Sequence, residues 1–127
     1  MGDTAVQTKT ARKILIIEDE GEMCLVLNIL LSEEPLELDH VKTIADAEAY
    51  LEKGQPSVVI LDNKLPDGFG VDYISLLKKN YPDLRIIMIT GFDASARDVA
   101  LENGADFFLQ KPFTRDQFLK SLNSLLN

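Results

Sequence analysis

Five polar side chains, each placed at or just after the end of a short apolar run, are the residues of this sequence best suited to chemistry. They are Glu18, Asp19, Asp62, Thr90 and Lys111. Carboxylates that share a crevice repel one another unless one is protonated or a cation lies between them. Carboxylate oxygens suit Mg²⁺, which accepts phosphate as a further ligand. A hydroxyl and an ammonium opposite such a cation can hold phosphoryl oxygens, and a carboxylate beside it can attack phosphorus.

Each of these residues also has a purely structural interpretation. Carboxylates in the segment Glu18–Glu20 are stabilised by a helix dipole if a helix starts there. That interpretation is favoured for Glu20, whereas a metal site is favoured for Glu18 and Asp19. Asp62 alone is typical of a turn before the letters PDG, and Lys111 alone is typical of a surface lysine. Taken together, the residues favour a site, with Asp62 as the nucleophile.

The elements that would position these residues alternate along the chain. Short runs rich in Ile, Val, Leu or Phe predict five strands, at Lys13–Ile17, Leu36–Val41, Val58–Leu61, Ile86–Ile89 and Phe107–Leu109. Four of them lack polar alternation, as expected for strands buried on both faces of a parallel sheet. Apolar residues at helical spacing predict a helix after every strand. The fold class is therefore α/β, a doubly wound (βα)5 parallel sheet whose strand ends share one edge.

The helix ends carry local signals. Gly54 and Gly104 are expected to end the second and fourth helices, and Thr114 with Gln117 has capping-box spacing at the start of the last helix. Residues 1–12 are polar and aperiodic, so a flexible tail is expected there and one domain over 13–127.

Composition narrows the function classes. The chain has 127 residues, is 46% hydrophobic and carries a net charge of −8, which disfavours binding to nucleic acid or to an anionic membrane. One cysteine, Cys24, allows no intramolecular disulfide. No apolar run is long enough to span a bilayer, and we expect a cytoplasmic protein.

The first helical segment carries more apolar residues than one buried stripe needs. Cys24, Leu25 and Ile29 add to its core positions, and two explanations stay open: a docking surface or a wide core stripe. Cys24 is expected to be a packing residue. His40 stands alone on the weak second strand and is expected to be exposed, not a metal ligand.

The motifs ILIIEDE, VVILDNKLPDGFG, MITG and GADFFLQKPF, in this order and spacing, resemble the receiver domain of two-component response regulators over residues 12 to 127. The resemblance implies the strand order 2-1-3-4-5. It also implies a domain that accepts a phosphoryl group from a phosphohistidine of a sensor histidine kinase or phosphotransfer domain. Such a domain catalyses its own phosphorylation and dephosphorylation and is not a conventional enzyme.

The resemblance also assigns roles to single residues. Asp62 is similar to the phospho-accepting aspartate. Mg²⁺, for which Mn²⁺ is expected to substitute, would be bound by Asp19 directly, by Glu18 through water, by Asp62, and by the backbone carbonyl of Lys64. Thr90 resembles the switch hydroxyl, and Lys111 would pair with phosphoryl oxygen. The bond from Lys111 to Pro112 is expected to be cis.

Phe108, three residues before Lys111, occupies the place of the switch aromatic. Its rotation would alter the surface formed by the fourth helix, fifth strand and fifth helix, through which partners or a homodimer could be controlled. In this family the positions of Lys64 and Phe92 flank the path of the hydrolytic water. A long cation and a bulky ring there predict a long-lived phosphoryl group. Glu18 stands where many relatives have Asp.

Other classes fit less well. A phosphatase of the haloacid-dehalogenase type needs a second Asp two residues after the nucleophile, where this chain has Lys64. A flavodoxin-like FMN binder needs a hydroxyl- and glycine-rich loop where this chain has Glu-Asp-Glu. A pseudo-receiver that binds partners without phosphate would not need the intact set of site residues. Whether the chain stands alone or belongs to a longer regulator is left open by the sequence.

Overall fold

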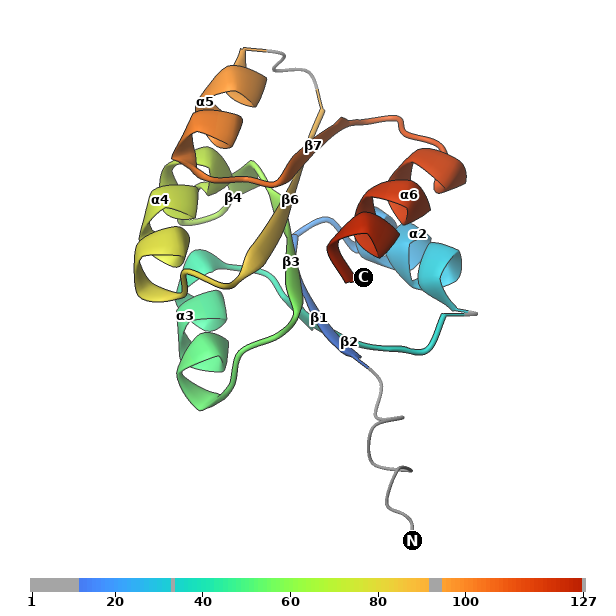
Figure 1. Cartoon of the computed structure of the whole chain (residues 1–127), viewed down its shortest axis with the longest axis horizontal. Coiled ribbons are helices and arrows are strands. Elements are labelled where there is room, and N and C mark those ends of the chain that lie inside the picture. Colours follow the sequence, from blue (N-terminus) through green and yellow to red (C-terminus); the bar gives the residue numbers. More distant parts are fainter. Residues whose placement is uncertain (1–11, 33, 92–94, 127) are drawn as a thin grey trace, which may run out of the picture.

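Five parallel strands form the middle layer of the computed structural model, which describes residues 12–32, 34–91 and 95–126 (Figure 1). These strands are β1 (Arg12–Ile17), β2 (Leu36–Val41), β3 (Val58–Asp62), β6 (Arg85–Thr90) and β7 (Phe107–Gln110). They lie in the order β2-β1-β3-β6-β7, and every neighbouring pair is parallel. This is the predicted order 2-1-3-4-5, since the two intervening strands belong to a separate short hairpin.

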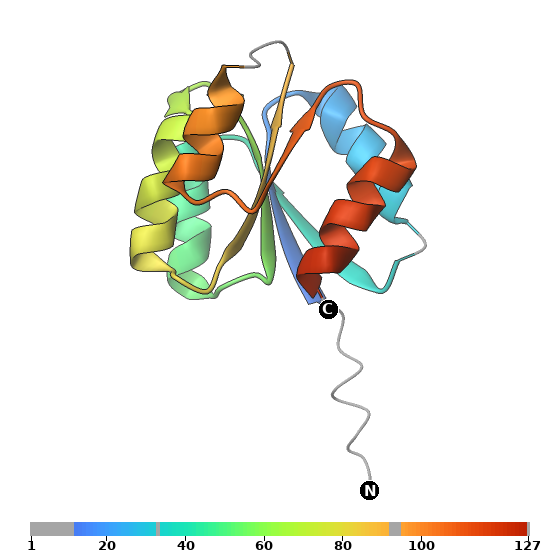
Figure 2. The ribbon, with the colours of Figure 1, turned by 45° about the horizontal axis from the view of Figure 1, so that its top comes forward.

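Within the described ranges, five helices cover the two faces of the sheet. On one face lie α3 (Ile44–Lys53), α4 (Gly70–Asn80) and α5 (Ala96–Asn103), and on the other lie α2 (Gly21–Leu31) and α6 (Arg115–Leu126) (Figures 1 and 2). The doubly wound (βα)5 fold is thereby confirmed. None of the helices in the described ranges is both long and apolar enough to cross a bilayer.

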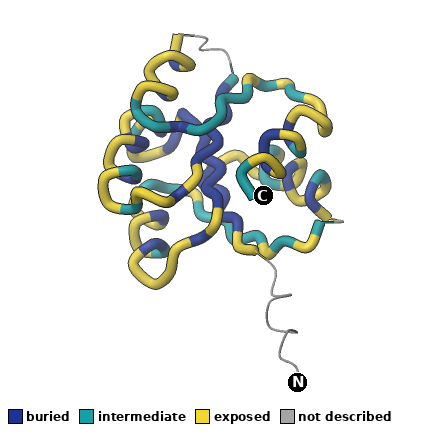
Figure 3. The backbone as a smooth tube through the Cα atoms, viewed as in Figure 1, coloured by how far each residue is buried: buried dark blue, intermediate teal, exposed yellow. Residues whose placement is uncertain are grey.

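The core consists of two apolar clusters, one on each side of the sheet. Successive strand residues alternate between them: Leu15 and Ile17 of β1 pack on the α3–α5 side, and Ile14 and Ile16 pack on the side of α2 and α6. Figure 3 shows the central strands as a continuous buried band. This two-sided burial explains why the runs lack polar alternation.

The boundary signals in the sequence are realised as local hydrogen bonds. The backbone N–H of Gln117 donates to Thr114 Oγ1 (3.0 Å), and the N–H of Thr114 donates to Gln117 Oε1 (2.9 Å), which completes the expected capping box. Gly104 ends α5 with a φ of 117°. Strand β1 begins at Arg12, one residue before the expected start of the domain at 13; the flexible tail stays a prediction, because residues 1–11 lie outside the described part.

The segment after β3 folds back on itself before α4 begins. It contains the hairpin of β4 (Lys64–Leu65) and β5 (Gly68–Phe69). Asn63 holds both ends of this segment. Its carbonyl accepts from the N–H of Gly70 (2.6 Å), and its side-chain Oδ1 accepts from the N–H of Val71 (3.0 Å). The direction in which the chain leaves Asp62 is therefore set by hydrogen bonds from the start of α4 to the backbone and side chain of Asn63.

Gly70 lies against the backbone of the residue that ends β3. A Cβ at Gly70 would stand 2.2 Å from the carbonyl oxygen of Asp62 and 3.0 Å from Leu61 Cγ. The first of these neighbours is backbone and cannot move aside. The close approach of α4 to the end of β3 therefore requires glycine at this position.

We expect Gly70→Ala to lower the free energy of unfolding by about 1–3 kcal/mol, the usual cost of overpacking. Urea unfolding monitored by circular dichroism measures the effect. Gly21→Ala is the matched control, because a Cβ at Gly21 meets no atom within 4 Å and alanine is the better helix former. An unchanged stability in Gly70→Ala would contradict the role given to this contact.

Candidate functional site

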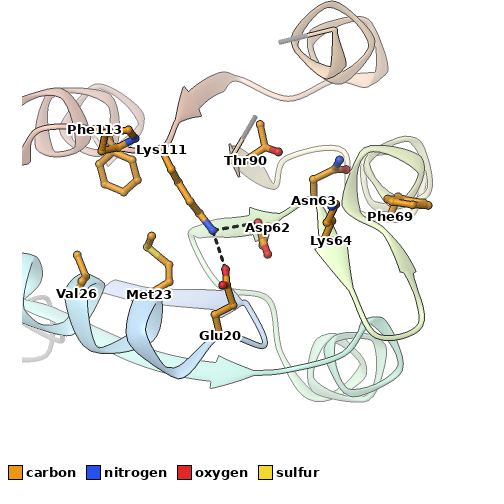
Figure 4. Close-up of a pocket in the computed structure, with 12 residues that line it drawn as sticks. Glu20, Met23, Val26, Asp62, Asn63, Lys64, Phe69, Thr90, Lys111 and Phe113 are labelled. Atoms are coloured by element: carbon orange, nitrogen blue, oxygen red, sulfur yellow. Dashed lines mark hydrogen bonds and ion pairs between the residues drawn. The ribbon is translucent and has the colours of Figure 1, made fainter. Parts of the chain in front are cut away.

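The predicted site residues from three strand ends meet at a pocket of about 900 Å³ on the carboxyl edge of the sheet (Figure 4). Asp62, Thr90 and Lys111 line it, from the ends of β3, β6 and β7. This is the place where an open parallel sheet forms its sites. The expectation that these three residues, far apart in the chain, come together is confirmed.

Lys111 is the centre of the charged groups. Its Nζ lies 3.5 Å from Glu18 Oε1, 3.2 Å from Glu20 Oε1 and 3.5 Å from Asp62 Oδ1. The backbone N–H of Lys111 donates to the carbonyl of Thr90 (2.8 Å), which ties the segment after β7 to the end of β6. The peptide bond to Pro112 is cis, as predicted. One ammonium thus faces three carboxylates.

The three carboxylates fit a hard divalent cation. Oxygens of Glu18, Glu20 and Asp62 lie within 4.8 Å of one another. Glu18 and Asp62 are buried, with 2% and 5% of their surface exposed, so water screens their repulsion poorly. One ammonium cannot balance three carboxylates, and oxygen donors of this kind suit Mg²⁺.

The pKa values reflect the crowding. Burial raises the pKa of Glu18 to about 7; the N–H of Glu20 opposes the shift and the charge of Asp62 adds to it. Burial also raises the pKa of Asp62, against the opposing effect of Lys111. Burial by itself would lower the pKa of Lys111, but the combined effects of Asp62, Glu18 and Glu20 outweigh it and the pKa is raised. The site therefore favours a bound proton or cation.

The second acidic residue of the cluster is not the expected one. Asp19 is exposed and lies outside the three-carboxylate group, whereas Glu20, interpreted above as a helix N-terminal carboxylate, belongs to it. The backbone N–H of Glu20, the residue just before α2, donates to Glu18 Oε2 (2.9 Å). Metal ligation by Asp19 stays a prediction from the resemblance.

The remaining predicted residues lie around the pocket or behind it. Thr90 is buried and Lys64 is exposed, and both line the pocket. Phe108 is half-buried and packs against the core on the α3–α5 side. Phe92 lies outside the described residues. The roles assigned to these side chains stay predictions.

An apolar rim of the pocket was not foreseen from the sequence. It consists of Met23, Val26, Phe69 and Phe113. Val26 has helical spacing with Met23 and Leu30, which favours a core position, but it is 42% exposed; Leu25 and Ile29 on the same helix are 61% and 63% exposed. The wide-core explanation is thus wrong for these residues. Helical periodicity could not predict this exposure, because it does not show that the helix lies beside a pocket at the strand ends.

His40 differs from the expectation of an exposed strand residue. It is half-buried, its Nε2 lies 2.7 Å from the carbonyl oxygen of Glu18, and its Nδ1 lies 3.2 Å from Cys24 Sγ. It therefore connects α2 to the backbone at the end of β1. Cys24 is half-buried in this contact, in keeping with a packing role.

The fold and the site together define a class: doubly wound α/β domains with an acidic, lysine-bearing site at the carboxyl edge. Comparison with known proteins narrows this. The profile of the response regulator receiver domain family matches residues 14–123. The chain belongs to that family.

Individual relatives agree with this assignment. The chain is 33% identical to the transcriptional regulatory protein BasR of Escherichia coli over 115 residues, which cover 90% of this chain and 52% of BasR. The curated relatives it matches are longer: the chain spans from about half to about two thirds of their length. The activities of these longer proteins therefore depend on more than the region that matches this chain.

Solved structures show the same architecture. One is the beryllofluoride-activated NtrC4 receiver domain dimer, with a TM-score of 0.83 and 34% identity over 89% of this chain and 94% of that one. Another is a CheY-like receiver domain protein from Methanospirillum hungatei, with a TM-score of 0.84 and 26% identity over 91% and 94%.

The pKa of Glu18 predicts a pH dependence of stability without divalent cations. The folded pKa of about 7 exceeds the ordinary value of 4.5, so between these pH values the folded chain holds a proton that the unfolded chain releases. The free energy of unfolding should then fall, on the order of 1–3 kcal/mol, as pH rises from 5 to 7.5. Urea unfolding in EDTA measures it.

Glu18→Gln is the matched variant, because it keeps an oxygen that can accept from the N–H of Glu20 but cannot ionise. We expect it to lose most of this pH dependence. An equal fall in wild type and Glu18→Gln would show that another group is responsible.

Proposed function

We propose that this domain accepts a phosphoryl group on Asp62 in two-component signalling. The observation that carries the proposal is the position of that carboxylate: buried at the end of β3, facing a pocket, with Lys111 Nζ 3.5 Å from its Oδ1. In the transfer, an Asp62 oxygen forms a bond to phosphorus as the bond to the donor nitrogen breaks. The electron pair of that bond stays on the donor imidazole.

The residues around Asp62 have complementary tasks in this proposal. Glu18, Asp19, Asp62 and the carbonyl of Lys64 would hold Mg²⁺, which supplies charge neutralisation as negative oxygens come together. Lys111 would bind a phosphoryl oxygen by a charge-assisted hydrogen bond. Thr90, which lines the same pocket, would donate its hydroxyl to another oxygen.

The phosphodonor is proposed to be a phosphohistidine on the helix pair of a sensor kinase or phosphotransfer domain. The apolar residues on α2 support this. Leu25, Val26 and Ile29 are exposed, and Val26 also lines the pocket. A donor helix that covered them would bury apolar surface while it brought its phosphohistidine to Asp62. We also propose that the domain acts in the cytoplasm.

The output face is proposed to be the surface of α5, β7 and α6. Phe108 lies on β7, half-buried against the core, and lines a second pocket of about 370 Å³ with residues of α6. A ring in this position can move inward if Thr90 moves toward a phosphoryl group. Val99 and Leu101 of α5 are exposed apolar residues available for a homodimer or another partner.

Beryllofluoride with Mg²⁺ tests the proposal, because it imitates a phosphoryl group on a carboxylate. We expect amide chemical shifts to change first around Asp62, Thr90 and Lys111 and then along β7 and α6. Asp62→Ala should abolish the response. A response that persists in Asp62→Ala would refute Asp62 as the acceptor, and size measurement in the same samples reports dimerisation.

The lifetime of the phosphoryl group forms a separate prediction. We propose that the side chain of Lys64 hinders an attacking water, and its position as an exposed lining residue of the pocket supports this. Lys64→Asn combined with Phe92→Glu should accelerate dephosphorylation several-fold, measured as loss of ³²P from the purified domain. An unchanged rate would contradict the proposed tuning role of these two positions.

A further inference from the structure

The strongest unexplained feature of the site is the carboxylate of Glu20. Its Oε1 lies 3.2 Å from Lys111 Nζ, closer than the oxygens of Glu18 and Asp62, which both lie at 3.5 Å (Figure 4). Its side chain is 64% exposed, whereas those of Glu18 and Asp62 are 3% and 7% exposed. Glu20 therefore contacts the ammonium from the solvent side, and the other two contact it from the protein side.

The solvent side is also the side from which a phosphoryl group must arrive. Glu18 and Asp62 are buried, whereas Glu20 is largely exposed and lines the same pocket as Asp62 and Lys111. A phosphoryl oxygen that binds Lys111 would then need the place that the Glu20 carboxylate holds. Two anions cannot share that place without strong repulsion.

We infer that Glu20 is a built-in competitor for Lys111: its carboxylate binds the ammonium in the unphosphorylated domain and must leave when a phosphoryl group binds. The inference rests on the proposed role of Asp62 and adds a residue that sets the affinity of the site for the phosphoryl group. Glu20 is suited to this role because an exposed side chain returns to water at little cost.

The alternative role, a ligand of the cation, predicts different behaviour. A ligand is needed most when the cation is bound, so its removal weakens Mg²⁺ binding. A competitor opposes the phosphoryl group, so its removal strengthens the binding of a phosphoryl mimic. The two roles therefore differ in which of the two affinities changes.

The test compares Glu20→Gln with Glu22→Gln in the full chain. Glu22 is an exposed acid in the first turn of the same helix and makes no ion pair with Lys111, so its variant removes an equal charge near the site. Beryllofluoride is titrated at saturating Mg²⁺ and followed by the amide shifts of Thr90 and Lys111. Mg²⁺ is titrated separately without beryllofluoride.

We expect Glu20→Gln to bind beryllofluoride about two- to fivefold more tightly than wild type, the range set by an exposed ion pair. Glu22→Gln should stay close to wild type. The gain should shrink at high salt, which screens exposed charges. In the ligand-free chain, the ammonium signal of Lys111 should shift in Glu20→Gln alone.

Three results would overturn the inference. The first is an equal gain in both variants, which would assign the effect to net charge. The second is a loss of Mg²⁺ affinity of tenfold or more in Glu20→Gln without tighter beryllofluoride binding, which would make Glu20 a ligand. The third is a wild-type chain that shows no response dependent on Asp62, which would remove the proposed function as well; the first two leave that function standing.

Discussion

The balance of one ammonium against three carboxylates is the constraint on which the functional edge of this domain depends. Glu18 and Asp62 are buried, and two ionised carboxylates in that environment repel each other unless a positive charge stands between them. Lys111 provides that charge, because its Nζ lies 3.5 Å from an oxygen of each carboxylate. The fold concentrates negative charge at the edge of the sheet, and the rest of the site consists of ways to neutralise it.

The fold holds Asp62 and Glu18 in fixed positions, so movement of these two side chains does not relieve their repulsion. Leu61 and Ile17 are buried immediately before the two acidic strand ends, so Asp62 and Glu18 cannot retreat to solvent without disturbing the core. Asn63 and Gly70 fix the chain beyond β3. Relief can come from a proton, a cation, or movement of a side chain that is still free to move. Of the three carboxylates around Lys111, Glu20 is largely exposed and has that freedom.

Much of the fold and part of the site could be predicted from the sequence, for separate physical reasons. Two-sided burial makes strand runs such as Val58–Leu61 continuously apolar, and parallel topology brings their carboxyl ends to one edge. These two rules suffice to bring Asp62, Thr90 and Lys111 together. They concern backbone topology, which the hydrophobic pattern specifies strongly.

The hydrophobic pattern does not specify which of several neighbouring acidic side chains points into the site. Glu18, Asp19 and Glu20 are consecutive, and Glu18, the buried one, accepts a local hydrogen bond at Oε2 from the N–H of Glu20. The helical spacing of Val26 favours a core position, yet Val26 lines the pocket and is exposed. His40 gained partners from two other elements. Such outcomes depend on contacts between distant residues, which periodicity does not contain.

Helix α2 and the residue before it bring an exposed apolar surface close to the charged groups of the site. One surface of this helix presents exposed Leu25 and Ile29, while the residue just before its first turn, Glu20, contacts Lys111. A partner helix that packed on the apolar side chains would therefore lie close to the competitor carboxylate. Docking would also exclude water, which strengthens the attraction of Lys111 to both anions and the repulsion between them. The phosphoryl group carries more negative charge than Glu20, so it gains more from Lys111. Departure of Glu20 from Lys111 would then be favoured at the moment when the donor is in place, so that binding and charge rearrangement would be coupled through a single short segment of the chain.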